Sequence, residues 1–162
     1  MEWEQRVSDL WASIDDLGEE EFLTRMEQLA DELPADSAVA AFERAASLDS
    51  TGHSDLAVPL YRQALDLGLE GERRRRAVIQ MASSLRNLGQ PRESVALLTA
   101  EREASSDNLD DAVNAFLALA LVDVGREREA VSLALTALAP HLPRYQRSLA
   151  NYAQLISDHP ST

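Results

Sequence analysis

The sequence predicts an all-α protein, a right-handed α-solenoid of antiparallel helix pairs, and three observations support this. Gly52, Gly89 and Gly125 lie 37 and then 36 residues apart, the period of a repeat with one helix–turn–helix per unit. Apolar residues recur at helical spacing along most of the chain. Alanine and leucine dominate the composition, with six Gly and six Pro, which favours helix. We therefore expect about nine helices: an N-terminal hairpin, three repeats and a C-terminal capping helix.

Local signals give each helix its expected bounds. The nine predicted helices are 2–17, 19–33, 37–50, 55–67, 72–88, 91–104, 109–124, 127–139 and 143–157. The first carries Trp3, Val7, Leu10 and Trp11 on one face, and Gly18 is expected to end it in a left-handed conformation. The second begins with three acids, which suit the dipole of a helix N-terminus, and ends before Pro34.

Glycines and prolines set most of the remaining boundaries. The third helix is expected to be capped by Asp36 or Ser37. Pro91 suits the first position of the sixth helix, because its fixed φ and missing N–H cost nothing there. Pro140 is expected to stop the eighth helix and Pro143 to open the ninth. These signals divide the chain into an acidic hairpin (1–34), a repeat array with its capping helix (35–157) and a frayed tail (158–162).

Small and large residues recur at fixed offsets around each turn glycine. The most complete copy is Ala45, Leu48, Gly52, Ala57, Tyr61 and Ala64. The second copy departs at Ser94, Leu98 and Glu101, and the third at Ala134. This pattern resembles the tetratricopeptide repeat over roughly residues 38–157. The segment GERRRRAVIQMASSLRNLG is similar to the group 5 repeat domain of short bacterial proteins.

The charge of the chain excludes some classes of partner. The net charge is −13, from 28 acids and 15 arginines, with no lysine. We read the arginine bias as codon usage of a high-GC bacterial genome. Strong acidity disfavours nucleic acid and anionic membrane, whose affinity for proteins is largely electrostatic. The absence of cysteine, of a signal-peptide pattern and of a long apolar run leads us to expect a cytoplasmic protein.

The titratable residues do not form a catalytic pattern. His53, His141 and His159 are far apart in the sequence and are expected at the surface. The acidic pairs Asp15–Asp16 and Asp110–Asp111 are adjacent, and adjacent helical positions point about 100° apart, so neither pair converges on a proton or a metal. No phosphate loop, zinc-binding motif or nucleophile elbow is present. We expect no catalytic residue, cofactor or metal.

The resemblance implies that the first helix of each repeat lines a concave groove that binds protein or peptide. Phe42 and Glu43 occupy such positions in the first repeat. The candidate partner-binding residues are Arg76, Ile79, Gln80, Ser83, Arg86, Asn87, Phe116, Leu119, Arg144, Arg147 and Asn151. Arginines and amides suit an acidic peptide or a C-terminal carboxylate. The alternative is that these arginines pair with acids of neighbouring helices or with water.

The run from Arg73 to Arg76 lies near a helix N-terminus, where cations oppose the helix dipole. It is either a solvated turn offset by nearby acids, or a docking patch for an acidic partner. The acidic hairpin 1–33 could itself fold onto this patch, in its own or a neighbouring copy.

Two functions follow from the sequence. The first is a non-catalytic scaffold that binds a protein segment in its groove. The second is a self-association module, a homodimer in which Trp3 and Trp11 pack between chains.

Overall fold

A computed structural model describes residues 2–158, and every regular element in that range is helical. The chain divides into two compact units, residues 1–84 and 85–162, with the boundary inside the fifth helix. Each unit is described separately. No helix in the described range is both long enough and apolar enough to cross a membrane.

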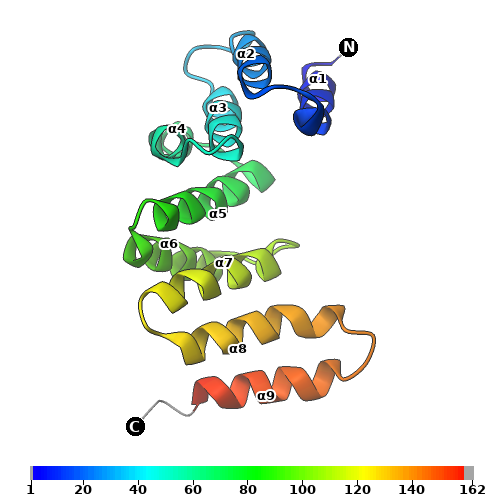
Figure 1. Ribbon diagram of the computed structural model, residues 1–162, viewed down its shortest axis with the longest axis vertical. Coiled ribbons are helices and arrows are strands. Elements are labelled where there is room, and N and C mark those ends of the chain that lie inside the picture. Colours follow the sequence, from blue (N-terminus) through cyan, green and yellow to red (C-terminus); the bar gives the residue numbers. More distant parts are fainter. Residues whose placement is uncertain (1, 159–162) are drawn as a thin grey trace. The chain divides into compact units, whose positions relative to one another are not determined.

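Unit 1 contains the hairpin and the first repeat. Its elements are α1 (Trp3–Ala12), the 3-10 turn η1 (Ile14–Asp16), α2 (Glu19–Ala30), α3 (Ala38–Ser50), α4 (Ser54–Asp66) and most of α5 (Gly71–Asn87). Helix α1 packs on α2, α2 on α3 and α3 on α4 (Figure 1). The expected cap is confirmed at α3, where the Ser37 hydroxyl accepts a hydrogen bond from the Ala40 amide at 3.2 Å.

Unit 2 contains the end of α5 and four further helices. Its elements are α6 (Pro91–Ala104), α7 (Asp110–Asp123), α8 (Glu127–Leu138), the 3-10 turn η2 (Ala139–His141) and α9 (Gln146–Asp158). Helix α6 packs on α7, α7 on α8 and α8 on α9, and the yellow-to-red helices run side by side in alternating directions (Figure 1). Pro91 opens α6 as expected.

The three turn glycines make the same backbone hydrogen bonds. Gly52, Gly89 and Gly125 have φ values of 89°, 78° and 77°. At Gly89 the glycine amide donates to the Arg86 carbonyl at 3.0 Å, and the next amide donates to the Leu85 carbonyl at 2.9 Å. Equivalent pairs of bonds follow α3 and α7. These are Schellman motifs, which end a helix through a left-handed residue. The glycines that repeat every 37 and 36 residues in the sequence therefore mark the C-terminal ends of α3, α5 and α7.

The small residues of the repeat lie where helices meet. Ala45, Ala82 and Ala118, seven residues before each turn glycine, are 0%, 0% and 6% exposed. Small residues at such crossings let two backbones approach closely. The aromatic position differs between copies, since Tyr61 is fully buried whereas Ala134 is exposed. The third copy therefore leaves uncovered a position that the first copy buries.

The N-terminal hairpin has a small apolar core of its own. Leu10, Phe22 and Met26 form a buried cluster, and Trp11 packs against it edge-on to Phe22, with ring centroids 5.2 Å apart. This arrangement confirms the expected apolar faces of the first two helices.

Some predicted boundaries were wrong. Gly18 does not end α1 as a left-handed residue: its φ is −68° and it precedes α2, while the turn after α1 is made by Ser13 and η1. The chain can coil into a 3-10 turn here because Ser13 donates its hydroxyl to the Leu10 carbonyl at 2.8 Å, which supports the helix end without a glycine.

The ninth helix also starts later than predicted. Helix α8 ends at Leu138, close to the predicted 139, and Pro140 lies in η2, but α9 begins at Gln146 rather than at Pro143. Tyr145 delays the helix because its φ is 69°, a left-handed conformation, while its carbonyl accepts the first helical bond from Leu149. Asp158, placed in a frayed tail by the sequence, is the last residue of α9, and residues 159–162 lie outside the described range.

Candidate interaction surface

In unit 1 the candidate surface is built around a buried carboxylate. Glu43 projects from α3 and is only 2% exposed. Its Oε2 accepts a hydrogen bond from the Trp11 indole Nε1 at 2.9 Å, and its Oε1 accepts one from Arg73 Nε at 3.0 Å. A buried carboxylate is stable only with such donors, because burial removes its water. Glu43 thus connects α1, α3 and α5.

Arg73 also binds helix α1 directly. Its two terminal nitrogens donate to Glu4 Oε1 at 3.1 Å and Oε2 at 2.6 Å, a bidentate contact. Its guanidinium lies 6.0 Å from the centroid of the Trp3 ring. The hydrogen bonds from Arg73 lower the pKa of Glu4, and those to Glu4 raise the pKa of Arg73. This residue of the arginine run is therefore occupied by the acidic hairpin of its own chain.

The other predicted residues of unit 1 are only partly accessible. Arg76 is half-buried, with its guanidinium 5.2 Å from the centroid of the Phe42 ring. Ile79 is buried, and Gln80 and Ser83 are half-buried. The Gln80 side-chain oxygen is buried and accepts no hydrogen bond from the described residues. The structure thus brings Arg73 and Arg76 together with aromatic rings of α1 and α3.

A half-buried acid, Asp49, makes a second polar network in the same unit. Asp49 of α3 accepts hydrogen bonds from the Ser84 hydroxyl at 2.6 Å and from the Tyr61 hydroxyl at 3.2 Å. Burial, with the negative charge of Asp49, raises the pKa of Tyr61 far above its ordinary value. The aromatic position of the first repeat therefore also carries a polar network that holds α3, α4 and α5 together.

In unit 2 the predicted arginine of α5 is paired within its own unit. Arg86 Nε lies 2.5 Å from Asp123 Oδ2, and its Nη2 donates a hydrogen bond to Asp123 Oδ1 at 3.4 Å. Both side chains remain about one-third exposed. The alternative that arginines pair with acids of neighbouring helices thus holds for Arg86.

The remaining predicted residues of unit 2 are accessible. Asn87 is exposed and Phe116 is half-buried. Leu119 is 47% exposed on α7. Arg147 and Asn151 are exposed on α9. Arg144 is exposed too, but it precedes the first residue of α9, so the prediction that it projects from that helix was wrong.

The sequence missed the partners of these side chains. Glu43 stood at a predicted groove position, but nothing local linked it to Trp11, 32 residues earlier. Glu4 and Arg73 are 69 residues apart. The one available signal was complementarity, because the acidic hairpin and the arginine run have opposite charge.

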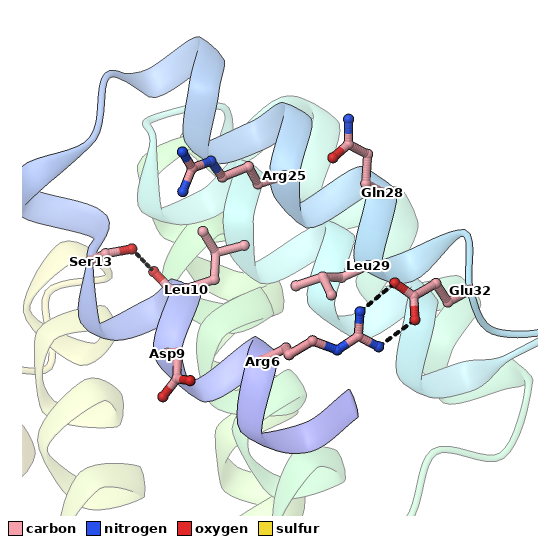
Figure 2. Close-up of a pocket in the computed structure, with 8 residues that line it drawn as sticks. All are labelled: Arg6, Asp9, Leu10, Ser13, Arg25, Gln28, Leu29 and Glu32. Carbon is pink, nitrogen blue, oxygen red and sulfur yellow. Dashed lines mark hydrogen bonds and ion pairs between the residues drawn. The ribbon is translucent and has the colours of Figure 1, made fainter. Parts of the chain in front are cut away.

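Two cavities contain polar side chains. The first, about 460 Å³, lies between α1 and α2, where Arg6 reaches across to Glu32 and donates two hydrogen bonds (Figure 2). This contact lowers the pKa of Glu32. The second, about 530 Å³ and within unit 2, contains Ser132, whose hydroxyl donates to the Ala153 carbonyl at 2.6 Å. Arg6, Glu32 and Ser132 are thus bonded to neighbours, although Arg6 Nε is buried and makes no hydrogen bond among the described residues.

His53 and His141 each pair with an acid, Asp110 makes a turn contact, and His159 lies outside the described residues. His53 lies 2.6 Å from Glu19, and His141 lies 2.8 Å from Asp111. No hydroxyl joins either pair in the described range, so neither forms a nucleophile with its base. Asp110 accepts a hydrogen bond from the Asp107 amide at 3.0 Å, which is a turn contact. Among residues 2–158 no group of three or more His, Asp or Glu could hold a metal ion.

Comparison with known proteins gave one result. A family model described as tetratrico peptide repeat matches residues 38–156, which is most of the chain. The match agrees with the resemblance seen at the turn glycines and in the segment from Gly71 to Gly89. Neither the curated proteins nor the solved structures gave a match.

Proposed function

Since the chain belongs to the tetratricopeptide repeat family, whose members generally mediate protein–protein interaction, we propose that it is a non-catalytic scaffold that binds a protein or peptide segment. The first helices of its repeats supply the binding side chains. The cysteine-free composition is compatible with a reducing cytoplasm, where we place this interaction.

The observation that carries the proposal is the exposed apolar face of α7. Val113, Leu117 and Leu121 are buried on one side of this helix. On the other side Leu119 is 47% exposed and Val122 is 50% exposed. A helix with a polar solvent face would place charged or amide side chains there. Burying the exposed half of each side chain would contribute about 1 kcal/mol.

Polar side chains exposed on another helix of unit 2 suggest the chemistry of the bound segment. Arg147 and Asn151 are exposed on α9 of the same unit. Arginine binds carboxylates in a bidentate manner, and an amide can bond to a peptide backbone. We therefore propose an acidic segment or a C-terminal carboxylate as the ligand. Arg86 can bind a carboxylate of the ligand only after its ion pair with Asp123 is broken.

Affinity capture with a matched control tests this proposal. The chain is used as bait in a lysate of its source, as wild type, as Leu119→Ser with Val122→Ser, and as Val131→Ser. Val131 is 46% exposed but lies on α8, the second helix of its repeat. Proteins that bind through α7 should be lost with the double variant and kept with the control. Equal recovery in all three samples would reject the α7 face.

For the second function, self-association through the hairpin, we propose only one arrangement, the exchange of α1 between two copies. Trp11 and Trp3 donate their indole N–H groups within the chain, to Glu43 and to the Leu29 carbonyl. A seam of free tryptophans between chains is therefore not favoured. Exchange of α1 between two copies would reuse the same contacts. Sedimentation of the wild-type chain over a concentration series distinguishes a dimer from a monomer.

A further inference from the structure

We propose that the face of unit 1 around Glu43 and Arg73 is a binding surface for an acidic, tryptophan-bearing helix of a partner protein, and that α1 occupies it as a built-in competitor. A partner helix of that chemistry binds by displacing α1. This inference rests on the proposed scaffold function and names one ligand class for it.

Helix α1 shows what the surface binds. Glu4 and Trp11 are seven residues apart, so they lie on one face of the helix. Glu4 supplies a carboxylate to the Arg73 guanidinium, and Trp11 supplies an N–H to the Glu43 carboxylate. The Trp3 ring lies against Arg73. Three different side chains of one short helix thus match two charged residues of the surface, Arg73 and Glu43.

The surface needs such a ligand because its own groups are not satisfied alone. Glu43 is 2% exposed and loses one of its two donors when α1 leaves. Arg73 then loses its bidentate carboxylate. A hydrogen bond to a charged group within the protein is more favourable than the bond to water that replaces it when α1 leaves. The exposed surface would therefore favour any helix that presents an acid and an indole at this spacing.

The hold of α1 on the surface is weak enough to be broken. The helix has ten residues, and isolated helices of this length are marginal in water. Only Val7 and Leu10 are buried. The Glu4 side chain is 63% exposed, so its ion pair with Arg73 is well screened by solvent. Short elements with few buried contacts are the ones that open locally.

This arrangement explains why arginines are present at the start of α5. Cations at a helix N-terminus oppose the helix dipole, so Arg73, in the first turn of α5, destabilises that helix locally. Arg73 takes an acid from α1, and Arg76 stacks on Phe42 beside it. Arg73 thus acts at the surface that α1 covers, and Arg76 packs on the residue next to Glu43.

A labelled peptide tests the proposal on the full chain. The probe is a fluorescent peptide of residues 2–17, titrated by anisotropy onto the wild type and onto a chain with Glu4→Gln and Trp11→Phe. These changes weaken only the chain's own α1, so they raise the fraction with a free surface. The peptide should bind this variant about tenfold or more tightly than the wild type, the effect of one hydrogen bond to a charged group. Equal binding, or none to either chain, would overturn the proposal.

Charge exchange separates specific docking from loss of fold. Arg73→Glu should abolish binding of the natural peptide, and a peptide with Glu4→Arg should restore it. Glu20→Arg is the control, because Glu20 is exposed on α2. Failure of the rescue, or an equal loss in the control, would contradict the assignment. A wild-type dimer that dissociates on Arg73→Glu would replace the partner helix with α1 of a second copy.

The scaffold function can be judged independently. The chain with Leu119→Ser and Val122→Ser should still bind the peptide, because those residues lie in unit 2. Failure of the peptide assay with intact capture through α7 would reject only the α1 surface. Failure of capture with intact peptide binding would reject only the α7 face.

Discussion

Replacing Glu43 with glutamine should loosen α1 while leaving the rest of unit 1 folded. The carboxylate accepts one hydrogen bond from Trp11 and one from Arg73. Each bond to a charged group contributes about 1.5–3 kcal/mol. A glutamine oxygen can accept a hydrogen bond from one donor, but its NH₂ group then faces the other donor.

The gross loss of stabilising free energy is about 3 kcal/mol. The neutral amide also avoids the cost of a buried charge. A net loss of about 2 kcal/mol makes opening of α1 roughly 30-fold more favourable.

The assay uses the position of the two tryptophans. Trp3 and Trp11 are the only ones in the chain and both lie on α1, so their fluorescence reports on this helix. Far-ultraviolet circular dichroism reports on all helices together. In a urea titration of Glu43→Gln, the fluorescence midpoint should fall below the dichroism midpoint by more than in the wild type.

The control is Glu27→Gln. Glu27 also accepts hydrogen bonds from an arginine, Arg44, at 2.9 and 3.0 Å, but its side chain is 56% exposed. Exposed pairs contribute about 1 kcal/mol or less. This variant should show no added separation of the two midpoints. If Glu43→Gln behaves like Glu27→Gln, the buried carboxylate does not hold α1 and the reasoning fails.

Two further predictions concern turn strain and acid. Gly89→Ala should lower the free energy of unfolding by about 1 kcal/mol, because alanine is strained at a φ of 78°. Gly18→Ala is the control and should be nearly neutral, because the φ of Gly18 is −68°. Chemical denaturation of the two variants compares their free energies of unfolding. Arg73 and Arg6 lower the pKa values of Glu4 and Glu32 below the ordinary 4.5. The stability that these acids contribute is therefore present above pH 4.5 and is lost as the pH falls through their lowered pKa values. Tryptophan fluorescence should report release of α1 as the pH falls below 4.5, and a signal that stays unchanged until the whole chain unfolds in acid would contradict it.

The helix ends were predictable where one residue determines the turn. Gly52, Gly89 and Gly125 needed a left-handed conformation, and this requirement is visible in the sequence. Gly18 and Pro143 misled because other residues took the same role. Ser13 capped α1 through its side chain, and Tyr145 adopted a positive φ that no propensity favours.

The site was harder to predict because its contacts are distant in sequence. Family resemblance suggested which face of a helix is exposed; Leu119 is exposed, whereas Ile79, assigned to the same groove, is buried. It could not indicate that Arg86 is held by Asp123 or that Arg73 is held by Glu4. Those contacts depend on how helices far apart in sequence pack, and no local pattern encodes them.

The residues that determine the turns of this protein are different from the residues that are exposed for binding. Each turn is specified by one glycine and two main-chain bonds, which depend on no outward-facing side chain. Substitutions on the exposed helix faces can therefore accumulate without disturbing the frame. Such a chain can acquire new ligands during evolution, or in the laboratory, through substitutions of exposed residues alone.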